Sequence, residues 1–189
     1  MAFTSTNVSV GKPQITGAVF RAPEGTSAPT TATTSLGGSF ADMGYISDEG
    51  WTNSKSRETS EIKAWGGDTV LTPQTGKSDT FQMTFIESLN IDVLKAVQGE
   101  TNVSGTLATG ITVIENSKEL EEGVWVIDTI MTGGVLKRTV IPHGKVTEVD
   151  DVVYKDDEAV GYGVTIQAFP DSTGATHYEY IEGAEESES

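Results

Sequence analysis

The segment VWVIDTIMTGGVLKRTVIP, residues 124–142, decides the fold of this chain. Two runs rich in β-branched and apolar residues flank Gly133-Gly134, and glycine tolerates positive φ at both central positions of a two-residue turn. The pattern therefore predicts a β-hairpin. A two-residue turn at this place pairs Asp128 with Thr139 across the two strands.

Both faces of the predicted hairpin carry apolar side chains. Trp125 and Ile127 lie on one face, while Val126 and Ile130 lie on the other, because side chains alternate along a strand. A strand that is apolar on both faces is usually covered on both sides. We therefore expect neighbouring subunits to cover one face of this hairpin.

Shorter segments with strand patterns surround the hairpin. They lie at residues 15–22, 43–47, 80–86, 146–154, 162–169 and 177–181. The alternation within 162–169 places Tyr162, Val164, Ile166 and Ala168 on the inner face. About eight to ten strands are expected in total, at a spacing that is typical of sandwiches and barrels.

One short helix is predicted after residue 90. Asn90 suits the N-cap, Ile91, Leu94 and Val97 form one apolar stripe, and Gly99 ends the helix. A helix of about nine residues is not stable alone, so it must pack on a sheet. The predicted fold is mainly β, with two packed β-sheets that form a sandwich or barrel flanked by this helix.

A chain of 189 residues and 20.0 kDa suits one domain. We expect an N-terminal arm without structure of its own at residues 1–13 and a single β-rich domain at 14–181. An acidic tail is expected at 182–189. Long loops are expected at 23–39 and 48–79, which are rich in polar and small residues.

The polar stretch 48–79 is the candidate contact surface. Residues 60–65 and 69–72 can pair as a protruding hairpin that turns at Gly66-Gly67. Tryptophan is enriched where protein chains meet, although Trp51 and Trp65 can equally fold back onto the core. The residues expected to contact another chain are Trp51, Lys55, Arg57, Trp65, Gly66 and Gly67.

Composition argues against several function classes. The chain has no cysteine, which rules out thiolate chemistry and cysteine-ligated zinc. A net charge of −16 gives no electrostatic basis for gripping nucleic acid or anionic lipid. No apolar run reaches the roughly 20 residues that span a bilayer, and no signal peptide is visible at the start. We expect a protein that is made in a cytoplasm and has no membrane partner.

Catalytic and metal-binding motifs are not found in the sequence. His143 and His177 lack a metal-ligand spacing. Gly76-Lys77-Ser78 imitates the end of a phosphate-binding loop, but a strand follows it where such a loop needs a helix. The carboxylates of 150–158 leave a weak calcium site open as a minor alternative. We therefore expect no enzyme activity, no cofactor and no metal.

The order of the segments resembles the tail tube proteins, or major tail proteins, of long-tailed bacteriophages of the siphovirus type. The segments that carry the resemblance are GAVFRAP (17–23), FADMGYISDEG (40–50), TFQMTFIE (80–87), NIDVLKAVQG (90–99), IPHGKVT (141–147) and YGVTIQAFPD (162–171). Together they extend over nearly the whole chain. No single motif among them is diagnostic.

The resemblance implies a structural protein of the virion tail that is synthesised in the host cytoplasm. Its subunits would form homo-hexameric rings that stack into a tube, and genomic DNA would pass through the lumen without specific binding. The arm 1–13 and the stretch 48–79 would contact neighbouring subunits or rings. Other implied partners are the tape measure protein and the tail terminator and tip proteins.

Three alternatives stay open at this point. A carbohydrate-binding or adhesin-like β-sandwich would use Trp51 and Trp65 as sugar platforms, but it would need a secretion route. An enzyme on a β scaffold would need a pocket with convergent polar groups. A tube protein of a contractile tail or secretion system would share the architecture, so the sequence does not separate it from the siphovirus type.

Overall fold

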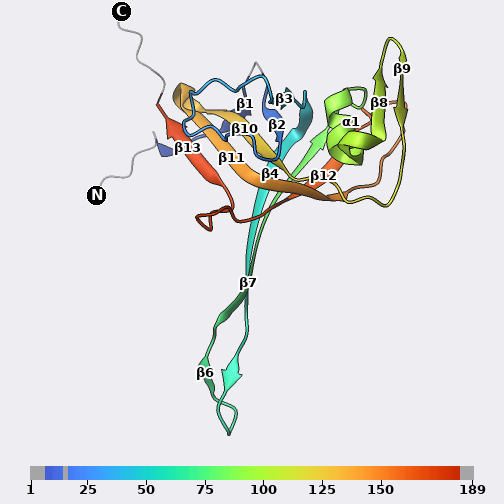
Figure 1. Cartoon of the computed structure of the whole chain (residues 1–189). Coiled ribbons are helices and arrows are strands. Elements are labelled where there is room, and N and C mark those ends of the chain that lie inside the picture. Colours follow the sequence, from blue (N-terminus) through green and yellow to red (C-terminus); the bar gives the residue numbers. More distant parts are fainter. Residues whose placement is uncertain (1–6, 15–16, 184–189) are drawn as a thin grey trace, which may run out of the picture.

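The computed structural model describes residues 7–14 and 17–183. Figure 1 shows a β-rich body from which a long two-stranded hairpin projects. The elements in chain order are β1 (Gly11–Pro13), β2 (Val19–Pro23), β3 (Ala41–Asp42), β4 (Ile46–Thr59), β5 (Ile62–Lys63), β6 (Thr69–Leu71), β7 (Gln74–Phe85), α1 (Ile91–Gln98), η2 (Glu100–Asn102), β8 (Val103–Thr106), β9 (Gly110–Val113), β10 (Gly123–Met131), η3 (Thr132–Gly134), β11 (Leu136–Val149), β12 (Tyr162–Ala168) and β13 (Tyr178–Glu182).

Most of the strands belong to one branched antiparallel sheet. Its main path has the order β3-β2-β10-β11-β12-β7-β4, with β1 added on β10 and β13 added on β11. The long strand β11 pairs with β13 through residues 136–140 and with β12 through residues 144–149. Two smaller sheets are the pairs β5–β6 and β8–β9. The predicted mainly β fold, with one short α-helix among the described residues, is confirmed.

The central hairpin β10–β11 forms in a different register from the predicted one. Asp128 lies opposite Arg138, so the predicted pairing of Asp128 with Thr139 is wrong by one residue. Thr132 joins the two glycines in the turn, and the Met131 amide donates to the Val135 carbonyl at 2.7 Å. The loop therefore has three residues, and the added residue shifts the register.

Both faces of this hairpin are buried within the single chain over residues 123–128 and 138–141, while the residues next to the turn are half-buried. Trp125 and Ile127 belong to the main core cluster, together with the side chains of β7, β12 and α1. Val126 and Val140, on the opposite face, are each 0% exposed. The expectation that neighbouring subunits cover one face is therefore wrong. The chain's own loop 23–39 crosses that face and is bonded to Arg138.

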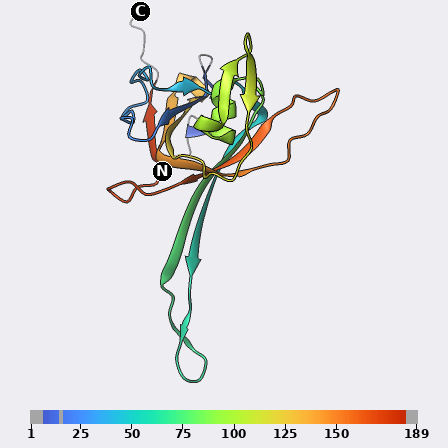
Figure 2. The same ribbon diagram turned by 45° about the vertical axis from the view of Figure 1, so that its right-hand side comes forward.

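The predicted helix is confirmed as α1. The Asn90 side chain accepts a hydrogen bond from the Asp92 amide at 3.0 Å, and Gly99 ends the helix with φ of 101°. Val93 and Val97 pack into the core cluster, so the helix is held against the sheet. Figure 2 shows α1 and the β8–β9 hairpin together on one side of the body.

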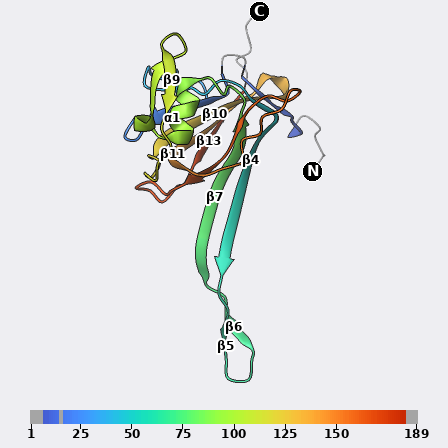
Figure 3. The ribbon, with the colours of Figure 1, turned by 90° about the vertical axis from the view of Figure 1, so that its right-hand side faces the viewer.

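The predicted loop 48–79 is mostly strand. β4 runs without a break to Thr59, and β7 begins at Gln74, so the two strands form a long antiparallel ribbon. The small hairpin β5–β6 continues the ribbon to its end. Figure 3 shows this ribbon leaving the body as an extended projection.

The two chain ends also contain more structure than predicted. Within the predicted arm 1–13, residues Gly11–Pro13 form β1 and pair with residues 129–131 of β10. Glu182, which was assigned to the acidic tail, is the last residue of β13. Residues 1–6 of the arm and 184–189 of the tail lie outside the described part of the chain.

Candidate functional site

The hairpin formed by β4 to β7 projects from the body of the protein (Figure 3). We divide it into a root (residues 46–53 and 79–85), a shaft (54–60 and 72–78) and a tip (61–71). Every residue of 54–71 is exposed. β4 is also the last strand in the sheet order, so its outer edge pairs with no other described strand. An unpaired edge of this length is a template for adding another chain.

The six predicted contact residues fall into three separate places on this hairpin. Trp51 lies at the root, half-buried, and its ring packs on Phe81 with centroids 6.0 Å apart. Trp51 thus folds back onto the core. Lys55 and Arg57 lie on the shaft, where the Arg57 guanidinium donates to Gln74 Oε1 at 2.7 Å.

The other three predicted contact residues lie together at the tip. Trp65 is fully exposed, and Gly66 and Gly67 both adopt positive φ in the turn. The Ala64 amide donates to the Asp68 carbonyl at 2.8 Å and closes this turn. Three more apolar side chains of the tip are exposed: Ile62, Val70 and Leu71. Exposed apolar side chains gathered in this way commonly mark a contact with another protein.

A buried carboxylate network holds the root of the hairpin. Asp79 is only 1% exposed and accepts hydrogen bonds from Asn53 Nδ2 at 2.7 Å and from Thr176 Oγ1 at 2.5 Å. His177 Nδ1 lies 2.6 Å from the same carboxylate, and Lys77 Nζ donates to Thr176 Oγ1 at 3.3 Å. The network therefore fastens the segment before β13 to the base of the projection.

This network lowers the pKa of the Asp79 carboxyl. Burial alone would raise that pKa, but the hydrogen bonds from Thr176, Asn53 and His177, and the charge of His177, outweigh burial and favour the ionised form. A carboxyl group whose pKa is lower in the folded state stabilises the fold at pH above its ordinary value of 3.8. That stabilisation is lost as the pH falls through the folded-state pKa.

Asp79→Asn tests this network through its pH dependence. At pH 7 we expect the variant to lower the free energy of unfolding by about 2 kcal/mol, because hydrogen bonds to an ionised group are lost. The deficit should shrink as the pH falls below 3.8, since the wild-type carboxyl then becomes protonated as well. Urea denaturation at several pH values measures this difference. A deficit that stays constant down to pH 2 would contradict the assignment.

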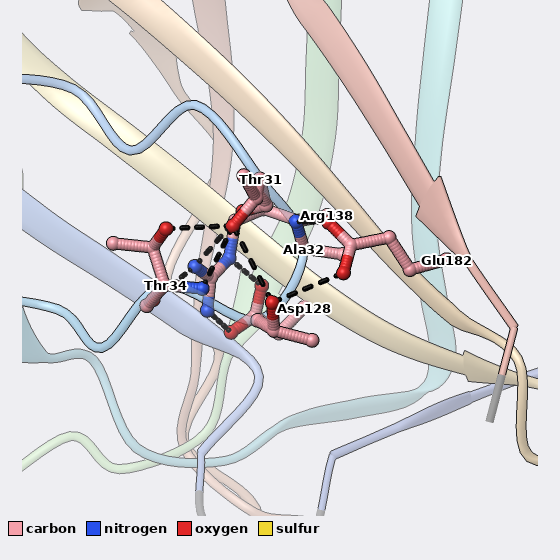
Figure 4. Close-up of polar contacts among 7 residues, drawn as sticks. Thr31, Ala32, Thr34, Asp128, Arg138 and Glu182 are labelled. Carbon is pink, nitrogen blue, oxygen red and sulfur yellow. Dashed lines mark hydrogen bonds and ion pairs between the residues drawn. The ribbon is translucent and has the colours of Figure 1, made fainter. Parts of the chain in front are cut away.

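A second polar network holds loop 23–39 against the hairpin β10–β11 (Figure 4). Arg138 binds Asp128 through two hydrogen bonds, from Nε at 2.7 Å and from Nη2 at 2.8 Å. Its Nη1 donates to the carbonyl oxygens of Thr34 at 2.5 Å and Thr31 at 3.3 Å. From β13, the Glu182 carboxylate accepts the Ala32 amide at 2.8 Å. Sequence reasoning missed this network because it depends on the observed register.

A cleft of about 890 Å³ lies between β1 and the root of β4. Charged and aromatic residues of its lining include Lys12, Tyr45, Trp51, Glu87 and Lys137. No histidine or cysteine is among the residues that line it. The lining therefore lacks histidine, the commonest general base, although it includes lysine and carboxylate side chains.

The two histidines lie in different surroundings. His177 contacts Asp79, whereas His143 lies near Glu24 and Glu122, and one ligand atom from each of these three residues falls within 4.8 Å of the others. Within 7–14 and 17–183 this is the only such grouping of potential metal ligands. The carboxylates of residues 150–158 do not form such a grouping of metal ligands. Among the same residues, no helix is long and apolar enough to cross a membrane.

The sequence matches the family model described as phage tail tube protein over residues 4–188. No curated protein matches it. A similar solved structure is the cryo-EM structure of the anti-feeding prophage cap, described as the AFP tube terminating cap. The two chains share 12% identity over 97% of this chain and 100% of that chain, with a TM-score of 0.45. Since the family match extends over nearly the whole sequence, this chain belongs to the phage tail tube protein family and is a structural component of the virion tail.

Proposed function

We propose that this protein is the repeating subunit of a phage tail tube. Six copies close into a ring, the rings stack, and the resulting tube conducts the genome during DNA ejection. The role is structural, without catalysis or cofactor. The partners are other copies of the chain, the tape measure protein and the tail terminator and tip proteins, while DNA passes without specific binding.

The observation that carries this proposal is the projecting hairpin. Residues 54–71 are all exposed in the single chain, and the tip presents Trp65 with apolar neighbours. The outer edge of β4 has no partner strand among the described residues. Such a projection is unfavourable for a protein that acts as a monomer, because an unpaired strand edge and exposed apolar side chains promote association with other chains. In a closed ring of subunits the same contact repeats at every interface, and it would cover both the open edge of β4 and the apolar side chains of the tip.

The charge of the chain suits a conduit for DNA. The sequence carries 28 acidic and 12 basic residues. A surface with this balance repels phosphate, so DNA can slide past it without being held. The alternative of a carbohydrate-binding module is less favoured. Its two proposed sugar platforms lie apart, with Trp51 packed at the root and Trp65 at the tip.

Shortening the hairpin tests the proposal. In the variant, a Gly-Asn turn replaces residues 62–71, and we expect a folded subunit that no longer forms rings or tubes at concentrations where the wild type does. Negative-stain microscopy and light scattering measure assembly, and circular dichroism checks the fold. The matched control removes residues 155–158 from another exposed loop. Tubes formed equally by the tip variant and the wild type would contradict the role of the tip.

A further inference from the structure

At one place on the body, the end of β2 and the start of β10 lie beside the middle of β11. Pro23 of β2 lies opposite Gly123 of β10, which in turn lies opposite Gly144 of β11. Each of these residues has a chain neighbour that can bind a metal ion: Glu24, Glu122 and His143. Residues far apart in the sequence are thus brought together by strand register.

The distances within this cluster are close to those of a metal site. One ligand atom from each of the three residues lies within 4.8 Å of the others, and His143 Nδ1 lies 3.7 Å from Glu122 Oε2. Ligand atoms around a tetrahedral zinc ion lie about 3.4 Å apart, as follows from bonds of about 2.0–2.1 Å. Glu24 is exposed and Glu122 and His143 are half-buried, so none of the three side chains is locked in a core.

Nearby basic side chains are engaged elsewhere. Lys145 lies 3.1 Å from Glu119, and Arg21 lies 3.8 Å from Glu100 with its guanidinium 5.7 Å from the centre of the Trp125 ring. Within the described ranges, no lysine or arginine lies within 4.0 Å of the carboxylate of Glu24 or Glu122. His143 is therefore the only basic side chain next to the carboxylates of Glu24 and Glu122 within the described ranges.

We propose that Glu24, Glu122 and His143 bind a divalent transition-metal ion of the Zn²⁺ class. The imidazole favours such an ion over Ca²⁺ or Mg²⁺, which prefer oxygen ligands only. Two carboxylates neutralise its charge, and water completes a four-coordinate site. The bound ion ties the end of β2 and the start of β10 to the middle of β11. The three residues of this site all lie outside the projecting hairpin, residues 46–85.

The test is titration of the full-length, tag-free protein with Zn²⁺ at pH 7.5, followed by calorimetry and by NMR of the histidine rings. The chain has only two histidines, so His177, held by Asp79, serves as an internal reference. We expect one Zn²⁺ per chain, shifted ring signals of His143 and unshifted signals of His177. Lowering the pH to 5.5 should weaken binding, because a ligating imidazole must be neutral.

Variants identify the ligands. His143→Gln and Glu122→Gln should each weaken Zn²⁺ binding at least about tenfold, whereas Asp157→Asn, which removes a carboxylate from an exposed loop, should leave it unchanged. The NMR experiment on the wild type stays decisive even where a variant fails to fold. The proposal is overturned if His143 signals do not move at millimolar Zn²⁺. It is also overturned if Zn²⁺ binds His143→Gln as well as wild type, or if Ca²⁺ displaces Zn²⁺ at equal concentration.

Discussion

Arg138→Met is expected to lower the free energy of unfolding by about 3–5 kcal/mol, because it leaves a buried charge without its partner. Asp128 is 6% exposed and receives two hydrogen bonds from Arg138. The carbonyl oxygens of Thr31 and Thr34 lose their donor in the same substitution. Urea denaturation followed by circular dichroism measures the loss.

The double variant Arg138→Met/Asp128→Leu is the matched control. Replacing both members of a buried ion pair by apolar residues is often close to neutral, so the double variant should be more stable than the single one. Part of the loss should remain, since loop 23–39 no longer has Arg138 to hold it. A single variant that costs less than about 1 kcal/mol would show that the pair does not hold this region together.

Trp125→Ala should destabilise the subunit by about 3–5 kcal/mol, as expected for removing a large aromatic side chain from a core. Trp125 is 1% exposed, and its ring stacks on Phe85 with centroids 6.4 Å apart. Its indole nitrogen donates to the Gly144 carbonyl at 3.2 Å. The substitution therefore removes packing from β7, β10 and β11 together. Thermal and urea unfolding measure the effect.

Trp65→Ala is the matched control for Trp125→Ala, because it makes the same substitution at an exposed position. Because Trp65 is fully exposed, its removal should change stability by less than about 0.5 kcal/mol. Assembly measured by light scattering should nevertheless decrease, since this side chain is the largest apolar group of the tip. A Trp65 variant that assembles as the wild type does would show that the tip contact does not depend on it.

Local patterns predicted the elements whose structure depends on neighbouring residues. The helix α1 was predictable because Asn90 and Gly99 cap it through contacts within a few residues. The inner face of β12 was predictable because alternation alone decides which side chains point inward, and Val164, Ile166 and Ala168 are all buried. In both cases the information lies within about ten residues of the chain.

The features that the sequence did not reveal depend on distant partners. The β10–β11 register differs by one residue because Thr132 enters the turn, which a glycine pair does not indicate. The hairpin β8–β9 was not predicted, since its strands are short and mostly exposed. The part of the ribbon within residues 48–79 was assigned to a long loop with a small hairpin at its tip, because its polar residues lack the alternation of a half-buried strand.

The candidate site was predicted only in part, for the same reason. The turn at Gly66-Gly67 was recognisable from the glycine pair, and the structure places Trp65 beside it. The position of Trp51 on Phe81 was not recognisable. The networks around Asp79 and Arg138 join residues about 100 positions apart, so neither spacing nor composition indicates them.

Loop 23–39 covers one face of the β10–β11 hairpin, so the subunit can fold before it associates with other subunits. Since Val126 and Val140 are already buried within one chain, the subunit does not need a neighbour to complete its core. The midpoint of its thermal unfolding, measured by circular dichroism at several protein concentrations, is therefore expected not to change, unlike that of an obligate oligomer. If the subunits assemble as proposed, folded subunits can accumulate first, and nucleation then decides when assembly begins.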